Sequence, residues 1–193
     1  MENSTAMKLN AGCGQFRKEG YVNLDMSRFS QADVFHDLES LPYPFDDETF
    51  ELIEADHVLE HLSDPFAVMA EFSRISKPGG MIKIRVPHFS RALSHPQHKR
   101  GFDVTFPFYF DPHFAGGYTG TPLTCLKNEL HWFSQKYLMK TLLSPARYYT
   151  LSAIGALLDA FAGLSPHCCS RLWCFWVGGF QEIEFIFEKS ADA

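Results

Sequence analysis

Two glycines separated by one residue, Gly12 and Gly14, follow a short apolar-flanked stretch near the start of the chain. Glycine has no Cβ, so it accepts positive φ angles and allows other atoms to approach its backbone closely. We therefore expect a buried first strand over residues 7–11, followed by a turn that lies against a ligand. A plain tight turn would have the same sequence, so the glycine pair alone does not establish a ligand site.

A second short strand, expected over residues 21–24, ends at the carboxylate of Asp25. Ligands of α/β sheets bind beyond the carboxyl ends of the strands, where an acidic residue can accept hydrogen bonds from a ribose diol. The dinucleotide fingerprint needs a third glycine and an acidic residue about 20 residues further on. Here Asp25 comes only 11 positions after Gly14, and no phosphate-binding Gly-Lys-Ser/Thr follows. These features favour a ligand that carries ribose but no pyrophosphate.

Five sequence blocks, in order and spacing, resemble those of class I S-adenosylmethionine-dependent methyltransferases. They are Leu9–Gly14, Asp25, Asp37–Tyr43, Glu54–His61 and Lys77–Gly80. The resemblance covers residues 7–90, fades after about Phe110, and is greatest to short bacterial methyltransferases of the methyltransferase-type-11 subgroup. It implies an α/β, Rossmann-like fold with a mostly parallel central sheet, an antiparallel last strand and helices on both faces.

The same resemblance implies S-adenosylmethionine as the cofactor. The residues that would bind it are Asn10, Ala11, Gly12, Cys13, Gly14, Asp25, Met26, Asp37, Leu38, Asp56 and His57. In this assignment residues 10–14 present backbone to the methionine part, Asp25 accepts from the ribose hydroxyls, and Asp37 accepts from the adenine amino group. A structural turn, a solvated carboxylate or a helix cap would explain the same residue types without a ligand.

The 193 residues fit one domain, and no polar linker, repeat or low-complexity segment divides them. We predict a single methyltransferase domain over 1–193, with a cofactor-binding half at 7–90 and an acceptor-side cover and C-terminal half at 87–180. The start of the chain lacks the apolar region of a signal peptide, and the most apolar tract, 153–164, is too short to span a bilayer. Five cysteines without paired spacing predict free thiols in a reducing compartment. We therefore expect a cytoplasmic protein without a transmembrane segment.

Strands and helices are expected to alternate along the chain, which predicts a parallel sheet with right-handed crossovers. Asp64 and Pro65 have the residue types of an N-cap and a first helical position, so a helix should run from Pro65 to about Ser76. A second helix is expected over 149–162. Beyond the first two strands, we expect strands at 32–36, 50–55, 81–86, 123–133 and 181–188.

Residues 87–120 are rich in histidine and proline and show no periodicity. Such a segment inside a compact domain is usually functional or mobile, and we interpret it as the cover of the acceptor site. If the acceptor is a hydroxyl, a general base helps, and histidine is the usual choice. The candidates are His88, His95 and His98, of which His88 is best placed because it directly follows the fifth strand. A bystander role would suit each of them as well.

Acidic residues outnumber basic ones in positions 1–71, and basic residues outnumber acidic ones in 72–193. The whole chain has a net charge of −6. An acidic half suits a sulfonium cofactor, and a basic half suits an anionic acceptor or surface, although ordinary solvated charge explains the same pattern. The candidate substrate-binding residues are His61, Arg91, Lys99 and Arg100. The overall acidity argues against binding of nucleic acid, which depends on many phosphate contacts.

His57 and His61 are four residues apart and could share one face of a helix. No third ligand with a defined spacing accompanies them, so we predict no metal site. The aromatic residues of 101–180 are expected mainly in the core, with an apolar acceptor pocket or peripheral contact with a membrane as alternatives.

The sequence as a whole predicts methyl transfer from S-adenosylmethionine to a small, anionic acceptor by in-line displacement. The protein's main task in such a reaction is to align the reactants. Two alternatives stay open: a catalytically silent partner subunit that binds S-adenosylmethionine, and a Rossmann-type oxidoreductase, which the missing third glycine and the early Asp25 disfavour. The acceptor atom and the oligomeric state are left open.

Overall fold

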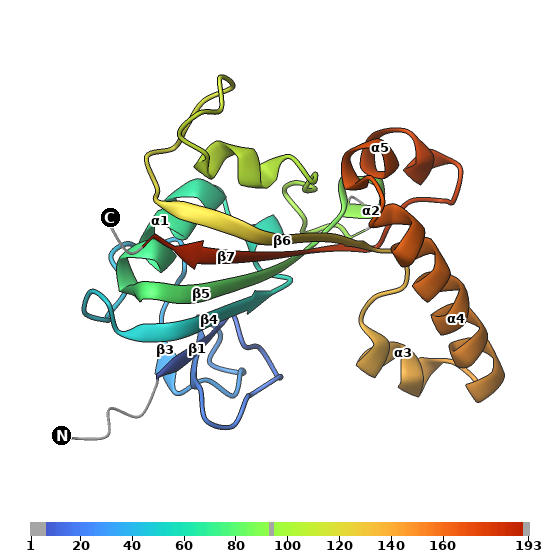
Figure 1. Ribbon diagram of the computed structural model, residues 1–193. Coiled ribbons are helices and arrows are strands. Elements are labelled where there is room, and N and C mark those ends of the chain that lie inside the picture. The colour runs from blue at the N-terminus through green and yellow to red at the C-terminus, as the bar shows by residue number, and fades with distance from the viewer. Residues whose placement is uncertain (1–6, 93–94, 191–193) are drawn as a thin grey trace.

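A seven-stranded sheet forms the centre of the computed structural model, which describes residues 7–92 and 95–190 (Figure 1). Across the sheet the strands follow the order β3-β2-β1-β4-β5-β7-β6. Strands β1 to β5 are parallel, and β7 lies antiparallel between β5 and β6. This confirms the predicted sheet, mostly parallel with an antiparallel last strand. The strands are β1 (Lys8–Ala11), β2 (Val22–Asp25), β3 (Val34–Phe35), β4 (Phe50–Asp56), β5 (Ser76–Pro87), β6 (Leu123–His131) and β7 (Glu182–Lys189).

The helices confirm both predicted helical segments and add several short ones. The Asp64 side chain caps α1 by accepting from the backbone N–H groups of Phe66 and Ala67, as its sequence position predicts. Helix α4 begins at Pro145, earlier than expected, with that proline at its first position. The α-helices are α1 (Pro65–Ile75), α2 (Phe89–Ala92), α3 (Lys136–Leu142), α4 (Pro145–Ala162) and α5 (Pro166–Arg171). The 3-10 helices are η1 (Leu59–His61), η2 (Phe106–Phe110) and η3 (Trp173–Phe175).

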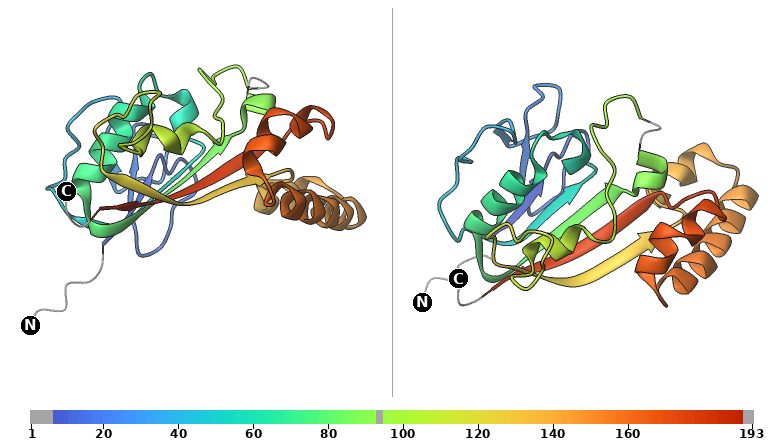
Figure 2. Two further views of the ribbon diagram at one scale, coloured as in Figure 1. Left: turned by 45° about the horizontal axis from the view of Figure 1, so that its top comes forward. Right: turned by 90° about the horizontal axis from the view of Figure 1, so that it is seen from above.

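One face of the sheet is apolar and is covered by α1 and η2 (Figures 1 and 2). The ring of Phe106 in η2 lies 5.7 Å from that of Phe185 in β7, and it stacks on Phe66 of α1. Phe110 contacts Phe187 with ring centroids 5.3 Å apart. These contacts place Phe106 and Phe110 in the core, as expected for aromatic residues that bury large areas, whereas Phe108 between them is 42% exposed.

The opposite face of β4, β5 and β7 carries charged side chains. Strand periodicity puts alternate residues on this face. Lys83 pairs with Glu54, and Arg85 Nε donates to Glu184 Oε2 at 2.7 Å. Burial alone would raise the pKa of Glu184, but hydrogen bonds from Lys127 and Arg85 lower it to about 2. Opposite charges in neighbouring strands therefore compensate one another across this face.

The connections β1–β2 and β2–β3 contain no helix in the described structure. In the β1–β2 connection, backbone N–H and C=O groups form hydrogen bonds with the side-chain amide of Asn23 instead. The Asn23 amide oxygen accepts from Asn10 Nδ2 and from the Lys18 N–H, both at 2.9 Å. Its Nδ2 donates to the carbonyls of Lys18 and Tyr21 and to Asp33 Oδ2. Both asparagines are buried, so these hydrogen bonds fix the path of the short β1–β2 connection.

The C-terminal helices α3, α4 and α5 gather beyond the carboxyl ends of β4 and β5 (Figure 1). Phe180 is fully buried there, whereas Leu164 and Trp176 are more than three-quarters exposed. Within residues 7–92 and 95–190, no helix combines the length and the hydropathy needed to cross a membrane. All five cysteines are free thiols, as predicted.

His88 directly follows β5 and is fully buried in the core. Its Nε2 lies 2.8 Å from Ser170 Oγ, and its Nδ1 lies 2.7 Å from Ser90 Oγ. The Ser170 hydroxyl in turn donates to Asp103 Oδ2. Burial lowers the pKa of His88 from 6.5 to about 4, although the charge of Asp103 acts in the opposite direction. The neutral ring is therefore a structural element that links β5 to the C-terminal helices.

The lowered pKa predicts that protonation of His88 destabilises the fold. The unfolded chain binds this proton near pH 6.5 and the folded chain only near pH 4, so stability is complete above pH 6.5 and falls as the pH drops toward 4. The difference corresponds to at most about 3 kcal/mol. Urea unfolding of the wild type should therefore show a steeper loss of stability over this interval than the His88→Gln variant. Parallel pH profiles for the two proteins would contradict the assignment.

Candidate functional site

Strands β1 and β4 are parallel neighbours, and the chain extends the sheet outward from β1 to one side and from β4 to the other. The loops that follow these two strands therefore both start at the carboxyl ends of the strands. Gly12 in the first loop has a φ of +68°, and a Cβ there would lie only 2.4 Å from Val58 Cγ2 in the second. Only glycine lets the two loops pack so closely. Open α/β sheets bind ligands at such points, where the strand order reverses.

Gly14 leaves an exposed stretch of backbone beside this point. Its φ is +50°, and a Cβ there would meet no heavy atom within 4 Å. The Gly14 N–H donates to Asp25 Oδ2 at 2.9 Å, and the Ser27 N–H donates to Asp25 Oδ1 at 2.7 Å. The glycine loop and the end of β2 therefore form one rigid cradle that is open to a ligand on the side of Gly14.

The other predicted cofactor-binding residues lie around this cradle. The Asn10 side chain is used by the fold, and Ala11 and Cys13 are buried, so these three offer backbone only. Met26, next to Asp25, is 67% exposed, whereas Leu38 is buried. Asp37 follows β3 and accepts from the Glu39 N–H. Asp56 is the last residue of β4, and His57 directly follows it. The predicted set therefore comes together along the carboxyl ends of β1 to β4.

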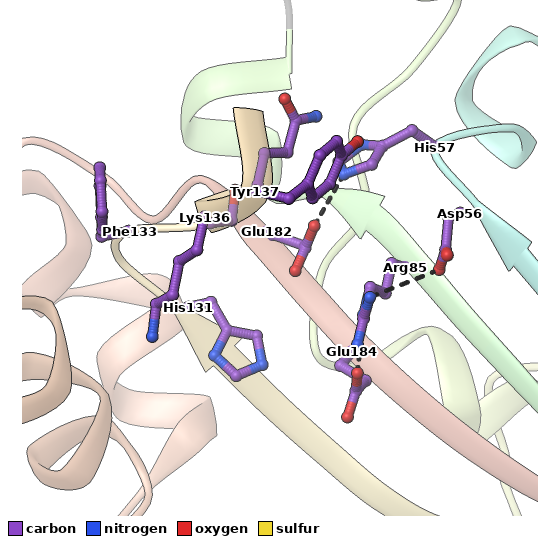
Figure 3. Close-up of a pocket in the computed structure, with 11 residues that line it drawn as sticks. Asp56, His57, Arg85, His131, Phe133, Lys136, Tyr137, Glu182 and Glu184 are labelled. Atoms are coloured by element: carbon purple, nitrogen blue, oxygen red, sulfur yellow. Dashed lines mark hydrogen bonds and ion pairs between the residues drawn. The ribbon is translucent and has the colours of Figure 1, made fainter. Parts of the chain in front are cut away.

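A cavity of about 380 Å³, here called the first cavity, opens beside Asp56 (Figure 3). Its walls come from the ends of β4 and β5, the start of β7 and α3. Phe16, in the loop after β1, contacts Tyr137 of α3 with ring centroids 5.3 Å apart, so α3 connects the glycine loop to this cavity. The lining residues are Asp56, His57, Arg85, His131, Phe133, Ser134, Gln135, Lys136, Tyr137, Glu182 and Glu184.

His57 lies between the first cavity and a second one. Its Nε2 lies 2.7 Å from Glu182 Oε2, and its Nδ1 lies 3.4 Å from Glu60 Oε1 (Figure 3 shows the Glu182 contact). Burial disfavours the charged ring, but these two carboxylates raise the pKa of His57 to about 9. His57 also has a φ of +56°, and Gln135, which lines both cavities, has a φ of +47°. Positive φ at non-glycine residues stores strain of the kind that collects at functional sites.

The second cavity has a volume of about 490 Å³ and shares His57, Ser134 and Gln135 with the first. It brings together four residues that the sequence singles out: His61, Arg91, His95 and His98. Its other lining residues are Glu60, Pro87, Met139 and Gln181. Of the described residues in 87–120, only Pro87, Arg91, His95 and His98 line the first or the second cavity. Phe106, in the same segment, packs on the apolar face of the sheet.

Three of the residues predicted for the acceptor side, Lys99, Arg100 and His88, lie outside both cavities. Lys99 Nζ donates to Glu39 Oε1 and Ser63 Oγ, and Arg100 donates to the Ser63 carbonyl. These bonds tie the segment after His98 to the start of α1 and away from the cavities. His88 is buried in its serine network. These three residues therefore do not line either cavity.

Several lining residues carry no clear signal in the sequence. Glu60 stands between His57 and His61 inside a block of the resemblance, but a helix surface would explain it equally well. Gln135, Tyr137 and Glu182 come from the half of the chain without a resemblance and reach the site only through the tertiary structure.

Comparisons with known proteins agree with this geometry. Residues 9–84 match the family model described as a methyltransferase domain. An uncharacterized methyltransferase of Schizosaccharomyces pombe is 37% identical over 54 residues, which is 28% of this chain and 19% of that protein's length. Residues 9–84 are therefore similar to a methyltransferase domain, over nearly the same stretch as the resemblance in the sequence.

Solved methyltransferases share this fold across nearly the whole chain. A SAM-dependent methyltransferase from Archaeoglobus fulgidus matches with a TM-score of 0.56 and 16% identity, covering 95% of this chain and 86% of its own. Phosphoethanolamine N-methyltransferase 2 from Haemonchus contortus, solved with S-adenosyl-L-methionine, matches with a TM-score of 0.54 and 17% identity, covering 96% of this chain and 49% of its own. The chain therefore shares the fold of these proteins over nearly its whole length.

The residues at the carboxyl ends of the strands fit S-adenosylmethionine, the cofactor that the sequence predicts. The open backbone at Gly14 and the carboxylate of Asp25 would hold it, because one offers close approach and the other accepts hydrogen bonds from hydroxyls. Asp37, which follows β3, adds negative charge that favours a sulfonium cation.

The open cradle at Gly14 predicts a specific loss of cofactor binding when Gly14 is replaced. Gly14→Ala adds a methyl group to the space that we assign to the cofactor, so the dissociation constant for S-adenosylmethionine should rise about tenfold or more, or about 1.4 kcal/mol. Gly20→Ala is the matched control, since Gly20 also has positive φ (+76°) and open space around it. Both variants should lose similar stability, and Gly20→Ala should bind nearly as wild type in calorimetric titration. Equal affinities for the two variants would contradict the placement.

Proposed function

We propose that this protein transfers a methyl group from S-adenosylmethionine to a small, anionic acceptor bound in the two cavities. One observation carries the proposal: Asp56 ends the strand next to the glycine loop, and His57, which directly follows it, lines both cavities. A ligand in the cradle and an acceptor in a cavity would therefore meet at the end of β4.

The chemistry requires little of the protein beyond alignment. When bound, the cofactor supplies a methyl group on an activated sulfonium sulfur. The residues around the cavities would hold the acceptor in line and exclude water, which can contribute roughly 7–11 kcal/mol to the lowering of the barrier. Helix α3 supports this role, because Ser134, Gln135 and Met139 beside or on it line the second cavity.

Positive charge in the cavities supports an anionic acceptor. Arg91 lines the second cavity, Arg85 and Lys136 line the first, and the raised pKa of His57 makes its ring cationic at neutral pH. The carboxylates of the first cavity are already engaged, since Glu184 accepts from Arg85 and Glu182 faces His57. Arginine is well suited to hold a carboxylate or phosphate through paired hydrogen bonds.

A general base, if the acceptor is a hydroxyl, would come from the second cavity. We propose His95 or His98 for this role, because both line that cavity. A cytoplasmic location and contact with a membrane stay predictions from sequence. The exposed side chains of Leu164, Phe175 and Trp176 are where such a contact would begin.

Cofactor binding is the first test of this proposal. Calorimetric titration with S-adenosylmethionine should show one site per chain, and Asp25→Asn should weaken it at least about tenfold, because a carboxylate acceptor of hydrogen bonds is lost. Asp46→Asn, at an exposed acid outside the site, should bind as wild type. Undiminished binding by Asp25→Asn would contradict the cofactor site.

Acceptor binding is tested by comparing Arg91 and Arg100, both of which are predicted from the sequence to bind the substrate. In a methyl-transfer assay with a panel of small carboxylate and phosphate compounds, Arg91→Met should raise KM about tenfold with a smaller change in kcat, since uniform binding is lost. Arg100→Met should change KM much less, because Arg100 bonds to Ser63 outside the cavities. Cofactor binding without turnover of any acceptor would instead favour the silent partner subunit.

A further inference from the structure

Glu60 is the least expected residue in the second cavity. Its side chain is fully buried, and in the described structure neither of its carboxylate oxygens accepts a hydrogen bond. Burying a charge without hydrogen-bonding partners is costly, so such groups are paired or coordinate metals. The nearest basic atoms belong to imidazole rings: Nδ1 of His57, which forms an ion pair with Glu60, lies 3.4 Å from Glu60 Oε1, and His98 Nε2 lies 3.8 Å from the same oxygen.

Two histidines beside Glu60 are oriented to offer a lone pair. Nδ1 of His98 lies 2.6 Å from the Ala92 carbonyl, and Nδ1 of His61 lies 3.2 Å from the Gln97 carbonyl. A carbonyl oxygen only accepts, so in both rings Nδ1 carries the hydrogen and Nε2 is unprotonated in the neutral ring. This is the arrangement by which backbone carbonyls fix metal-binding histidines.

The geometry points to a metal site. Ligand atoms of Glu60, His61 and His98 all lie within 4.8 Å of one another. Bonds of about 2.0–2.2 Å to an ion between them would need ligand atoms about 3–4 Å apart, so a small contraction closes the site. We propose that these three residues bind one divalent transition-metal ion. Two imidazoles and one carboxylate favour zinc or a similar ion over magnesium or calcium, which prefer oxygen ligands.

The site has an open side. Glu60, His61 and His98 all line the second cavity, and His95 extends the wall by stacking on His98 with ring centroids 4.7 Å apart. With three protein ligands, the remaining coordination positions face that cavity. An ion there would polarise an oxygen atom of the bound acceptor as a Lewis acid. This role rests on the proposed methyl transfer, whereas binding of the ion does not.

A rival group is less suited to an ion. Ligand atoms of Glu129, His131 and Glu184 also lie within 4.8 Å of one another. However, Glu184 already accepts from Arg85 and Lys127. Those cations neutralise it, and a metal ion would have to displace them or lie beside them. The rival group therefore provides the control for the experiment.

The test is calorimetric titration of the chelator-treated, full-length protein with zinc chloride alone. We expect one tight site per chain in the wild type, at least about tenfold weaker binding for both His98→Ala and Glu60→Gln, and unchanged binding for His131→Ala. A far-UV circular dichroism spectrum like that of the wild type serves as the check that each variant is folded.

Three results would overturn the metal site: no zinc binding by the wild type, wild-type affinity in both His98→Ala and Glu60→Gln, or loss of binding in His131→Ala alone. If zinc fails to bind while S-adenosylmethionine binding and turnover persist, the metal site is wrong and the proposed function stands. If zinc binds as expected while S-adenosylmethionine does not, the proposed function fails and the metal site stands.

Discussion

The hydrogen bond between two buried side-chain amides, Asn10 and Asn23, is the constraint on which the cofactor site depends. The chain joins β1 to β2 without a helix, so the backbone polar groups of this connection need other partners. Asn23 supplies them by bonding to Lys18 and Tyr21, and Asn10 fixes the loop through the Phe16 carbonyl. With the connection held in this way, Gly14 and Asp25 are brought close enough to bond to each other.

The division of the sheet into an apolar and a charged face determines where the cavities form. The apolar face is covered by α1 and η2, whose side chains pack against it. On the charged face, Asp56, Arg85 and Glu184 pair across neighbouring strands and form the floor of the first cavity. The charges of these walls are thus compensated in pairs, so this face of the sheet is polar and lines a cavity that suits a polar acceptor.

Much of the fold could be predicted from local sequence signals. The Asp64-Pro65 pair predicts the start of α1, and glycine, proline and alternating apolar residues predict most of the strands. Asp25 could be found for the same reason, since its position at the end of a short strand is a local property. The predicted cofactor-binding residues therefore lie close to one another along the carboxyl ends of the strands.

The acceptor side could not be predicted in this way, because long-range contacts create it. His57 meets Glu182 across 125 residues, and His98 meets Glu60 through a loop without periodicity. His88 illustrates the limit most clearly. It lies at the carboxyl end of β5, as predicted for a site residue, but its side chain points into the core. Because successive side chains of a strand point to opposite faces of the sheet, an error of one residue in register places a side chain on the wrong face.

The most direct test of the account is a crystal structure with S-adenosylhomocysteine, the demethylated product of the cofactor. The account predicts that the ligand contacts Gly14 and the carboxylate of Asp25, with its sulfur facing the end of β4 at Asp56 and His57. Density for the ligand in the second cavity instead, or at a site that does not touch Gly14 or Asp25, would contradict it.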